Sequence, residues 1–198
     1  MVRQSIGIKG YLGERIVRQW LENIVYKNEK HLKIVEQIVP LELYSPGGAF
    51  LDFGIIKNNK VYDIYEVKAQ DYLLDRDDFN EPLIKMWKKE TDYLDFKIQN
   101  NDEIFKSSKS VVPTLILLSP PDGNSIRNKL RDFEFQHIIF FSKIFNDFKE
   151  SDFEISIDKI FEDMKKDIIF EINELQNPKK GKNNLVLFNN KLNDIEML

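Results

Sequence analysis

Two short β-type stretches of the chain carry acidic and basic side chains at a spacing suited to metal chemistry. Asp52 lies in the first stretch, and Glu66 and Lys68 lie in the second, with Glu66 fourteen residues after Asp52. Residues two apart in a strand point to the same face, so Glu66 and Lys68 share one face of their strand. Two carboxylates offer the oxygen ligands that Mg²⁺ prefers, and the lysine supplies a positive charge beside them.

The segment between the two stretches sets their register. Residues 58–60 read Asn-Asn-Lys and are predicted to form a three-residue hairpin loop. Lys57 would then pair with Val61, and counting back along the hairpin places Asp52 opposite Glu66. Directly opposite residues lie about 4.5–5.5 Å apart. The predicted hairpin therefore gathers both carboxylates into one patch.

Opposed carboxylates repel each other and destabilise a hairpin, so a bound cation is the expected compensation. The alternative interpretation is a solvated strand face on which Glu66 and Lys68 are simply exposed. A two-residue loop would favour this alternative, because a register shift of one residue turns Glu66 to the opposite face. The pattern alone leaves both interpretations open.

The composition of the whole chain is typical of a folded domain. It has 198 residues, of which 42% are hydrophobic and 31% are charged, and its net charge is −4. This charge argues against a strongly basic nucleic-acid-binding protein, although it is compatible with a local basic groove. The absence of cysteine excludes a disulfide scaffold, a thiol nucleophile and a cysteine-based zinc site. No signal-peptide pattern follows Met1, and no apolar run approaches the roughly 18 residues that cross a bilayer, so we expect a cytoplasmic protein.

The order of predicted elements indicates an α/β fold. Apolar residues at helical spacing predict a first helix from about Lys9 to Tyr26, and Glu14 lies at the edge of its apolar stripe. Three strands followed by alternating helices and strands predict a three-layer α/β/α core with a mixed sheet. Besides the two acidic strands, we expect strands at 34–43, 111–118 and 136–142 and helices at 80–99, 124–133 and 158–176.

The predicted domain covers residues 1–176. Residues 177–198 are expected to be a polar linker and a C-terminal tail, because the segment Pro178–Asn184 is polar and basic. Within this tail, Leu185–Phe188 is a candidate for a short edge strand or a contact with another chain.

This ordered set of residues and elements resembles the PD-(D/E)xK nuclease superfamily, which has a restriction-endonuclease-like core. The resemblance spans roughly residues 10–142. It consists of Glu14 on the first helix, Asp52 on the second strand and Glu66-Val67-Lys68 on the third. The segment Gly10–Glu14 is similar to the opening of resolvase-like members, in which a glutamate of the first helix joins the metal site.

The resemblance implies roles for these residues. Asp52 and Glu66 would be the principal ligands of Mg²⁺, for which Mn²⁺ is expected to substitute, and the Val67 carbonyl would supply a further oxygen. Lys68 would position the attacking water or stabilise charge on the phosphate, and its ordinary pKa of about 10.4 favours charge stabilisation. Glu14 would complete a second metal site or orient water, or else it would be a surface glutamate.

The resemblance also implies hydrolysis of phosphodiester bonds, usually in DNA. We therefore expect a metal-dependent DNA endonuclease, in which Gln70 is a weaker candidate for contact with phosphate or water. A structure-selective, resolvase-like nuclease is the competing enzyme subtype. The alternative from another class is a catalytically inactive nuclease-like subunit for DNA binding or assembly. A homodimer or a partner subunit is compatible with these readings, and no membrane partner is expected.

Overall fold

The chain is described from a computed structural model, which covers residues 8–44, 50–68, 95–99, 103–108, 111, 113–118 and 138–176. It forms two compact units, Met1–Ile155 and Ser156–Leu198, and each is described by itself. The sheet belongs to the first unit, and helix α5 (Ile157–Gln176) belongs to the second. Several predicted features lie outside the described residues: Gln70, the helix at 124–133, most of the helix at 80–99, and the tail at 177–198.

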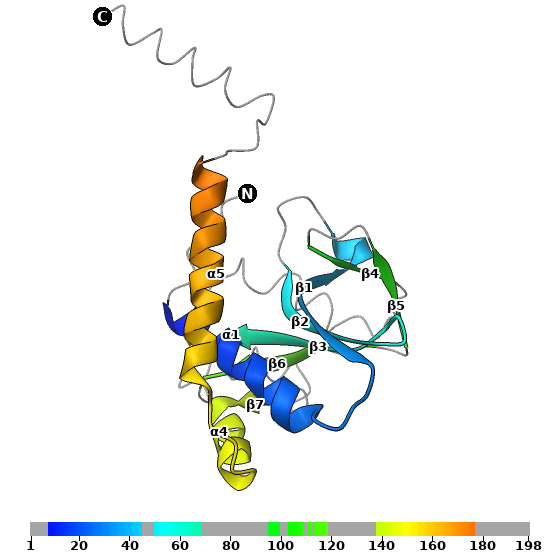
Figure 1. Cartoon of the computed structure of the whole chain (residues 1–198). Helices are drawn as coiled ribbons and strands as arrows, with labels where there is room; N and C mark the ends of the chain where they lie inside the picture. The colour runs from blue at the N-terminus through cyan, green and yellow to red at the C-terminus, as the bar shows by residue number, and fades with distance from the viewer. Residues whose placement is uncertain are drawn as a thin grey trace, which may run out of the picture. The chain divides into compact units, whose positions relative to one another are not determined.

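The sheet closes on itself along part of its width. Within the described residues it has seven strands in the order β2-β1-β4-β5-β3-β6-β7, and an additional pairing joins β2 to β3. The five strands from β1 to β5 therefore form a closed barrel, and β6 and β7 continue the sheet beyond β3 (Figure 1). The strands are β1 (Leu32–Pro40), β2 (Leu51–Lys57), β3 (Lys60–Lys68), β4 (Asp95–Ile98), β5 (Ile104–Ser107), β6 (Pro113–Leu117) and β7 (Ile138–Phe140).

Strand β3 belongs to both parts of the sheet. One of its edges pairs with β2 in the antiparallel sense. Its other edge pairs in parallel, first with β5 near Val61 and then with β6 from Ile64 to Lys68. Antiparallel and parallel pairs thus coexist, which confirms the predicted mixed sheet in an α/β protein. The finer expectation of three layers stays a prediction.

Two hydrophobic clusters stabilise the first unit, and full burial of each large apolar side chain contributes roughly 1.5–3 kcal/mol. The first cluster draws on the barrel strands and includes Val35, Ile38, Ile56, Ile64 and Phe96. The second joins the sheet to helices α1 (Ile8–Trp20) and α4 (Phe141–Glu150) and includes Val17, Trp20, Phe53, Tyr65 and Ile144. Side chains alternate between the two faces of a strand, so β2 and β3 contribute to both clusters.

The first helix agrees with its predicted extent. Helix α1 continues as a π-helical turn over Leu21–Val25, which is closed by a hydrogen bond from the Tyr26 N–H to the Leu21 carbonyl at 2.9 Å. Val17, Trp20 and Leu21 from the predicted apolar stripe are buried. This burial holds α1 against β3, the strand that carries Glu66.

Three other segments differ from the prediction. Asp95–Ile98 is strand β4, where we expected the end of a helix, and Ile104–Ser107 is strand β5, where we expected a polar connection. In β4 every second residue is buried, which is the pattern of a strand with one covered face. Helix α4 was not expected, although its buried residues Phe141, Ile144 and Phe148 follow helical spacing.

The second unit contains helix α5, whose predicted extent of 158–176 is confirmed to within one residue. It begins beside Ser156, whose hydroxyl accepts a hydrogen bond from the Lys159 N–H at 3.2 Å, an arrangement that stabilises a helix N-terminus. No helix in the described part of the chain is long and apolar enough to cross a membrane.

Candidate active site

The loop of the β2–β3 hairpin is shorter than predicted. It has two residues, Asn58 and Asn59, because Lys57 pairs with Lys60. Both asparagines have positive φ values, 51° and 58°, as a two-residue type I′ turn requires. The predicted three-residue loop, with Lys57 opposite Val61, is therefore wrong.

A β-bulge in β3 restores the predicted register beyond the loop. Ile56 pairs with Val61 and Ile55 pairs with Asp63, so Tyr62 is the extra residue. A bulge of this kind sets two residues of one strand against one residue of its partner. The extra residue offsets the missing loop residue, and Glu66 keeps the face on which the prediction placed it.

Asp52 and Glu66 meet where the backbone pairing of the hairpin ends. The last backbone pair joins Phe53 to Tyr65, and one further step in this register brings Asp52 opposite Glu66. The Asp52 N–H donates to Glu66 Oε2 at 3.3 Å, and the Val67 N–H donates to Asp52 Oδ2 at 2.7 Å. Side-chain oxygens thus replace the backbone hydrogen bonds of the strand pair at this point. We call the site formed by Asp52, Glu66 and the Val67 backbone the fork.

Lys68 joins the fork from β3. Its Nζ forms an ion pair with Glu66 Oε1, and the two side chains are only 18% and 7% exposed. Both oxygens of Glu66 are therefore engaged, one by Lys68 and the other by the Asp52 N–H. The structure brings together the three residues that the sequence pattern singled out.

The Val67 carbonyl also faces the fork. The N–H and C=O groups of one strand residue point to the same side of the strand. Because the Val67 N–H reaches Asp52, the Val67 carbonyl points to the side of β2 as well. The next carbonyl, that of Lys68, points the other way and accepts the Leu118 N–H at 3.1 Å. A backbone oxygen of β3 thus points to the side on which β2 lies.

Glu14 belongs to the same electrostatic cluster. It lies on α1, which packs against β3, and its side chain is half-buried. Burial raises the pKa of Glu14 from 4.5 to about 7, the Arg15 guanidinium opposes this rise, and the Glu66 carboxylate adds to it. Glu14 is therefore not a fully exposed glutamate of the helix surface.

Negative charge is in excess at the fork. Burial raises the pKa of Asp52 well above its ordinary value, and the carboxylates of Glu66 and Glu14 raise it further. Lys68 is the cation that opposes them, and although burial lowers its pKa, the carboxylates of Glu66 and Asp52 produce a net rise. With the Lys68 ammonium and the Arg15 guanidinium as their neighbouring cations, these three carboxyl groups form a site at which a further cation would stabilise the ionised forms.

The oxygens at the fork are suited to Mg²⁺, which binds proteins through one or two carboxylates and keeps several water ligands. Asp52, Glu66 and the Val67 carbonyl provide such oxygens. No group of three or more His, Cys, Asp or Glu side chains in the described residues is already arranged to hold a metal ion. Because Lys68 and the Asp52 N–H engage Glu66, a metal ion would have to compete with these donors.

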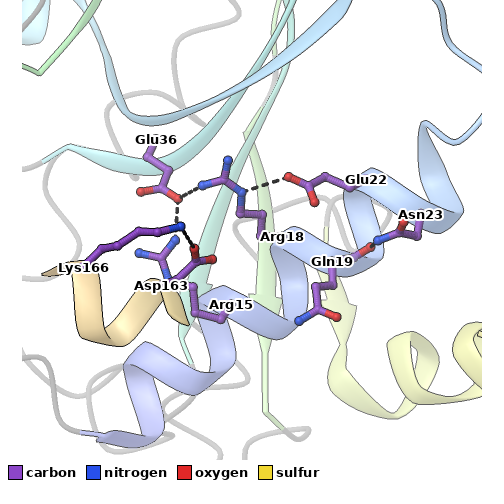
Figure 2. Close-up of polar contacts among 8 residues, drawn as sticks. All are labelled: Arg15, Arg18, Gln19, Glu22, Asn23, Glu36, Asp163 and Lys166. Atoms are coloured by element: carbon purple, nitrogen blue, oxygen red, sulfur yellow. Dashed lines mark hydrogen bonds and ion pairs between the residues drawn. The ribbon is translucent and has the colours of Figure 1, made fainter. Parts of the chain in front are cut away.

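An ion-pair network that sequence reasoning missed connects α1 to β1 (Figure 2). Arg15 Nη1 donates to Glu36 Oε1 at 2.7 Å, and Arg18 Nη1 donates to the same oxygen. Arg18 also donates to Glu22 Oε1 at 3.0 Å. The spacing of Arg15, Arg18 and Glu22 on one helix was a visible signal, but their shared partner Glu36 depends on the fold.

This network lies next to the fork. Glu36 of β1 pairs with Phe53 of β2, the neighbour of Asp52. Arg15 directly follows Glu14 on α1. The ion pairs therefore fix the helix that carries Glu14 against the strand beside the one that carries Asp52.

Asp63 is separate from the fork, because it lies three residues before Glu66 and therefore on the opposite face of β3. It accepts a hydrogen bond from the Tyr26 hydroxyl at 2.7 Å, and the Tyr26 and Tyr65 hydroxyls are 2.8 Å apart. These contacts attach the end of the first helical segment to β3.

Comparisons of the chain with protein-family models, with curated proteins and with solved structures found no match.

Proposed function

We propose that the chain is a metal-dependent endonuclease of the PD-(D/E)xK type, which hydrolyses phosphodiester bonds in DNA. The observation that carries the proposal is the convergence of Asp52, Glu66 and Lys68 at the fork. Carboxylates that can hold a metal ion, with an ammonium beside them, form a set suited to phosphodiester hydrolysis. The parallel strands β3, β6 and β7, with α1 against β3 and α4 against β7, support the expected restriction-endonuclease-like core.

In this proposal, Asp52, Glu66 and the Val67 carbonyl hold Mg²⁺ or Mn²⁺. The bound ion supplies charge at the phosphate and lowers the pKa of a water ligand. Lys68 stays protonated at neutral pH because the carboxylates raise its pKa, so it donates a hydrogen bond to a phosphate oxygen rather than accepting a proton. Glu14 orients water at the edge of the fork or completes a second metal site.

The test is a cleavage assay with the full chain on supercoiled plasmid, branched DNA and single-stranded DNA, with Mg²⁺ or Mn²⁺. We expect metal-dependent cutting that falls roughly 100-fold or more in Asp52→Asn and Lys68→Met, because each change removes charge stabilisation at the reacting phosphate. Lys57→Met is the matched control, since Lys57 pairs with Glu29 at the loop end of the same hairpin. Equal cutting by Lys68→Met and the parent chain would contradict the proposal, and the preferred substrate would separate the endonuclease subtypes.

A second candidate is a catalytically inactive nuclease-like subunit for DNA binding or assembly. The engagement of both Glu66 oxygens by groups of the protein favours it, because those oxygens are then less available to a metal ion. Such a subunit would bind DNA or a protein partner, as a homodimer or a hetero-complex, without any need for Mg²⁺. Metal-independent DNA binding in a gel-shift assay, together with uncut substrates, would support this candidate.

A further inference from the structure

The Lys68 ammonium contacts the most buried carboxylate of the fork. Glu66 is 5% exposed, and its Oε1 is in the ion pair with Lys68. Its Oε2 accepts the Asp52 N–H at 3.3 Å, while Asp52 Oδ2 accepts the Val67 N–H at 2.7 Å. Both Glu66 oxygens and Asp52 Oδ2 thus already have donors, and one of those donors is itself a cation.

A divalent ion and the Lys68 ammonium have the same sign of charge, and both would bind the Glu66 carboxylate. Two cations that share a poorly hydrated carboxylate repel each other, so the binding of one weakens the binding of the other. Lys68 and Glu66 lie two residues apart on β3. The backbone of β3 is fixed at both positions, because residues Ile64 to Lys68 pair with β6. The flexible four-carbon stem of lysine allows the ammonium to leave Glu66 without any change in the strand.

We propose that Lys68 is the resident counter-ion of the fork, which a divalent cation must displace from Glu66 in order to bind. The inference rests on the proposed metal-dependent function and concerns the regulation of that site. Lys68 then has two opposite effects. It lowers the affinity for the metal, and once displaced it is released to contact a phosphate oxygen. Metal binding and the release of Lys68 become a single event.

The test is a calorimetric titration of the parent chain, Lys68→Met and Lys57→Met with Mn²⁺. We expect Lys68→Met to bind Mn²⁺ roughly tenfold more tightly than the parent, because a unit charge in contact with a buried carboxylate has at least that effect. Lys57→Met removes the same charge and a lysine–glutamate ion pair outside the fork, that with Glu29 at 2.5 Å, so its affinity should match the parent. Equal or weaker binding by Lys68→Met would overturn the inference.

A measurement on the parent chain covers the case in which Lys68→Met does not fold. Lysine acetylation by acetic anhydride is followed by peptide mass spectrometry, with and without saturating Mn²⁺. We expect the acetylation rate of Lys68 to rise several-fold with Mn²⁺, because release from Glu66 exposes the amine and lowers its pKa, while Lys57 is unchanged. An unchanged or falling rate at Lys68 would contradict displacement.

The failure of this inference differs from the failure of the proposed function. If the parent binds Mn²⁺ and Glu66→Gln does not, the metal site stands. If Lys68→Met then binds Mn²⁺ no more tightly than the parent, the proposed displacement of Lys68 is wrong. If neither the parent nor Lys68→Met binds Mn²⁺, both fail. If Lys68→Met binds and the parent does not, the displacement is supported in its strongest form.

Discussion

Glu66 connects the charged groups of the fork, since it contacts Lys68 through one oxygen and the Asp52 backbone through the other. Burial raises the pKa of its neighbours Asp52 and Glu14, and the Glu66 carboxylate raises both pKa values further. A structural carboxylate would more often be held by donors that lower its pKa. Raised pKa values of several carboxylates at one place are typical of functional sites.

The raised pKa of Glu14 predicts a pH-dependent cost to stability. Its pKa rises from 4.5 to about 7, so between these values the folded chain binds more protons than the unfolded chain. Stability therefore falls as pH rises from about 4.5 to 7 and then levels off. Each pKa unit corresponds to about 1.4 kcal/mol of unfolding free energy, and coupling to neighbouring groups reduces the total. We therefore expect the unfolding free energy of Glu14→Gln to rise by roughly 2–3 kcal/mol relative to the parent between these two pH values.

Urea denaturation of both proteins in EDTA, from pH 4.5 to 8, measures this effect. The difference in unfolding free energy between Glu14→Gln and the parent should grow with pH. Parallel curves for the two proteins would show that Glu14 is not held in the acidic cluster.

At the scale of elements, the hairpin shows what a sequence pattern can and cannot provide. The strands around Asp52 and Glu66 were predictable, because both segments are short runs rich in residues that favour β-structure. The two-residue loop and the bulge at Tyr62 were not predictable. The loop is one residue shorter than expected and the bulge adds one residue, so Glu66 keeps its predicted register. Strands β4 and β5 were missed because the closure of the barrel, a non-local event, decides the conformation of such short segments.

Strands β1 and β2 pack closely at Gly54, which lies two residues from Asp52. A Cβ at this position would lie 2.7 Å from Ile38 Cδ1 and 3.2 Å from Val35 Cγ2. Gly54→Ala should therefore destabilise the fold by roughly 1–3 kcal/mol, because an extra methyl in a filled core forces its neighbours to shift.

Chemical denaturation measures this loss, and Ile38→Val supplies its control. Ile38→Val removes the atom closest to the added methyl, so the double variant should lose less than the sum of the two single variants. Strictly additive losses would mean that the two positions do not press against each other.

A separate prediction concerns Glu36, whose ion pairs connect β1 to α1. Glu36→Gln removes the carboxylate that Arg15 and Arg18 share, and because Glu36 itself is partly exposed we expect a loss of only roughly 1–2 kcal/mol. Glu22→Gln is the matched control, since Glu22 pairs with Arg18 one turn along the same helix and should cost no more than about 0.5 kcal/mol. Thermal unfolding of both variants gives the comparison, and equal losses would contradict the role of Glu36.

At the scale of the molecule, the fold class and the mixed sheet were predictable, and the closed barrel was not. The largely apolar run at 111–118 is typical of a strand covered on both faces, and its residues Leu115, Ile116 and Leu117 are buried in β6. The extra pairing of β2 with β3, by contrast, leaves no local mark on the sequence. Helix α5 was predictable from its spacing, but its membership of the second unit, Ser156–Leu198, was not.

The fork also has a place in the order of folding. Asp52 and Glu66 are fourteen residues apart in the chain, whereas the contact between Trp20 and Asp147, which ties α1 to α4, spans 127 residues. Short loops close at a lower entropic cost than long ones, and hairpins form within microseconds. The two carboxylates are therefore expected to meet before the helices pack against the sheet. Their repulsion then acts on the nascent hairpin, so the refolding rate of the chain should depend on divalent ions as well as its final stability.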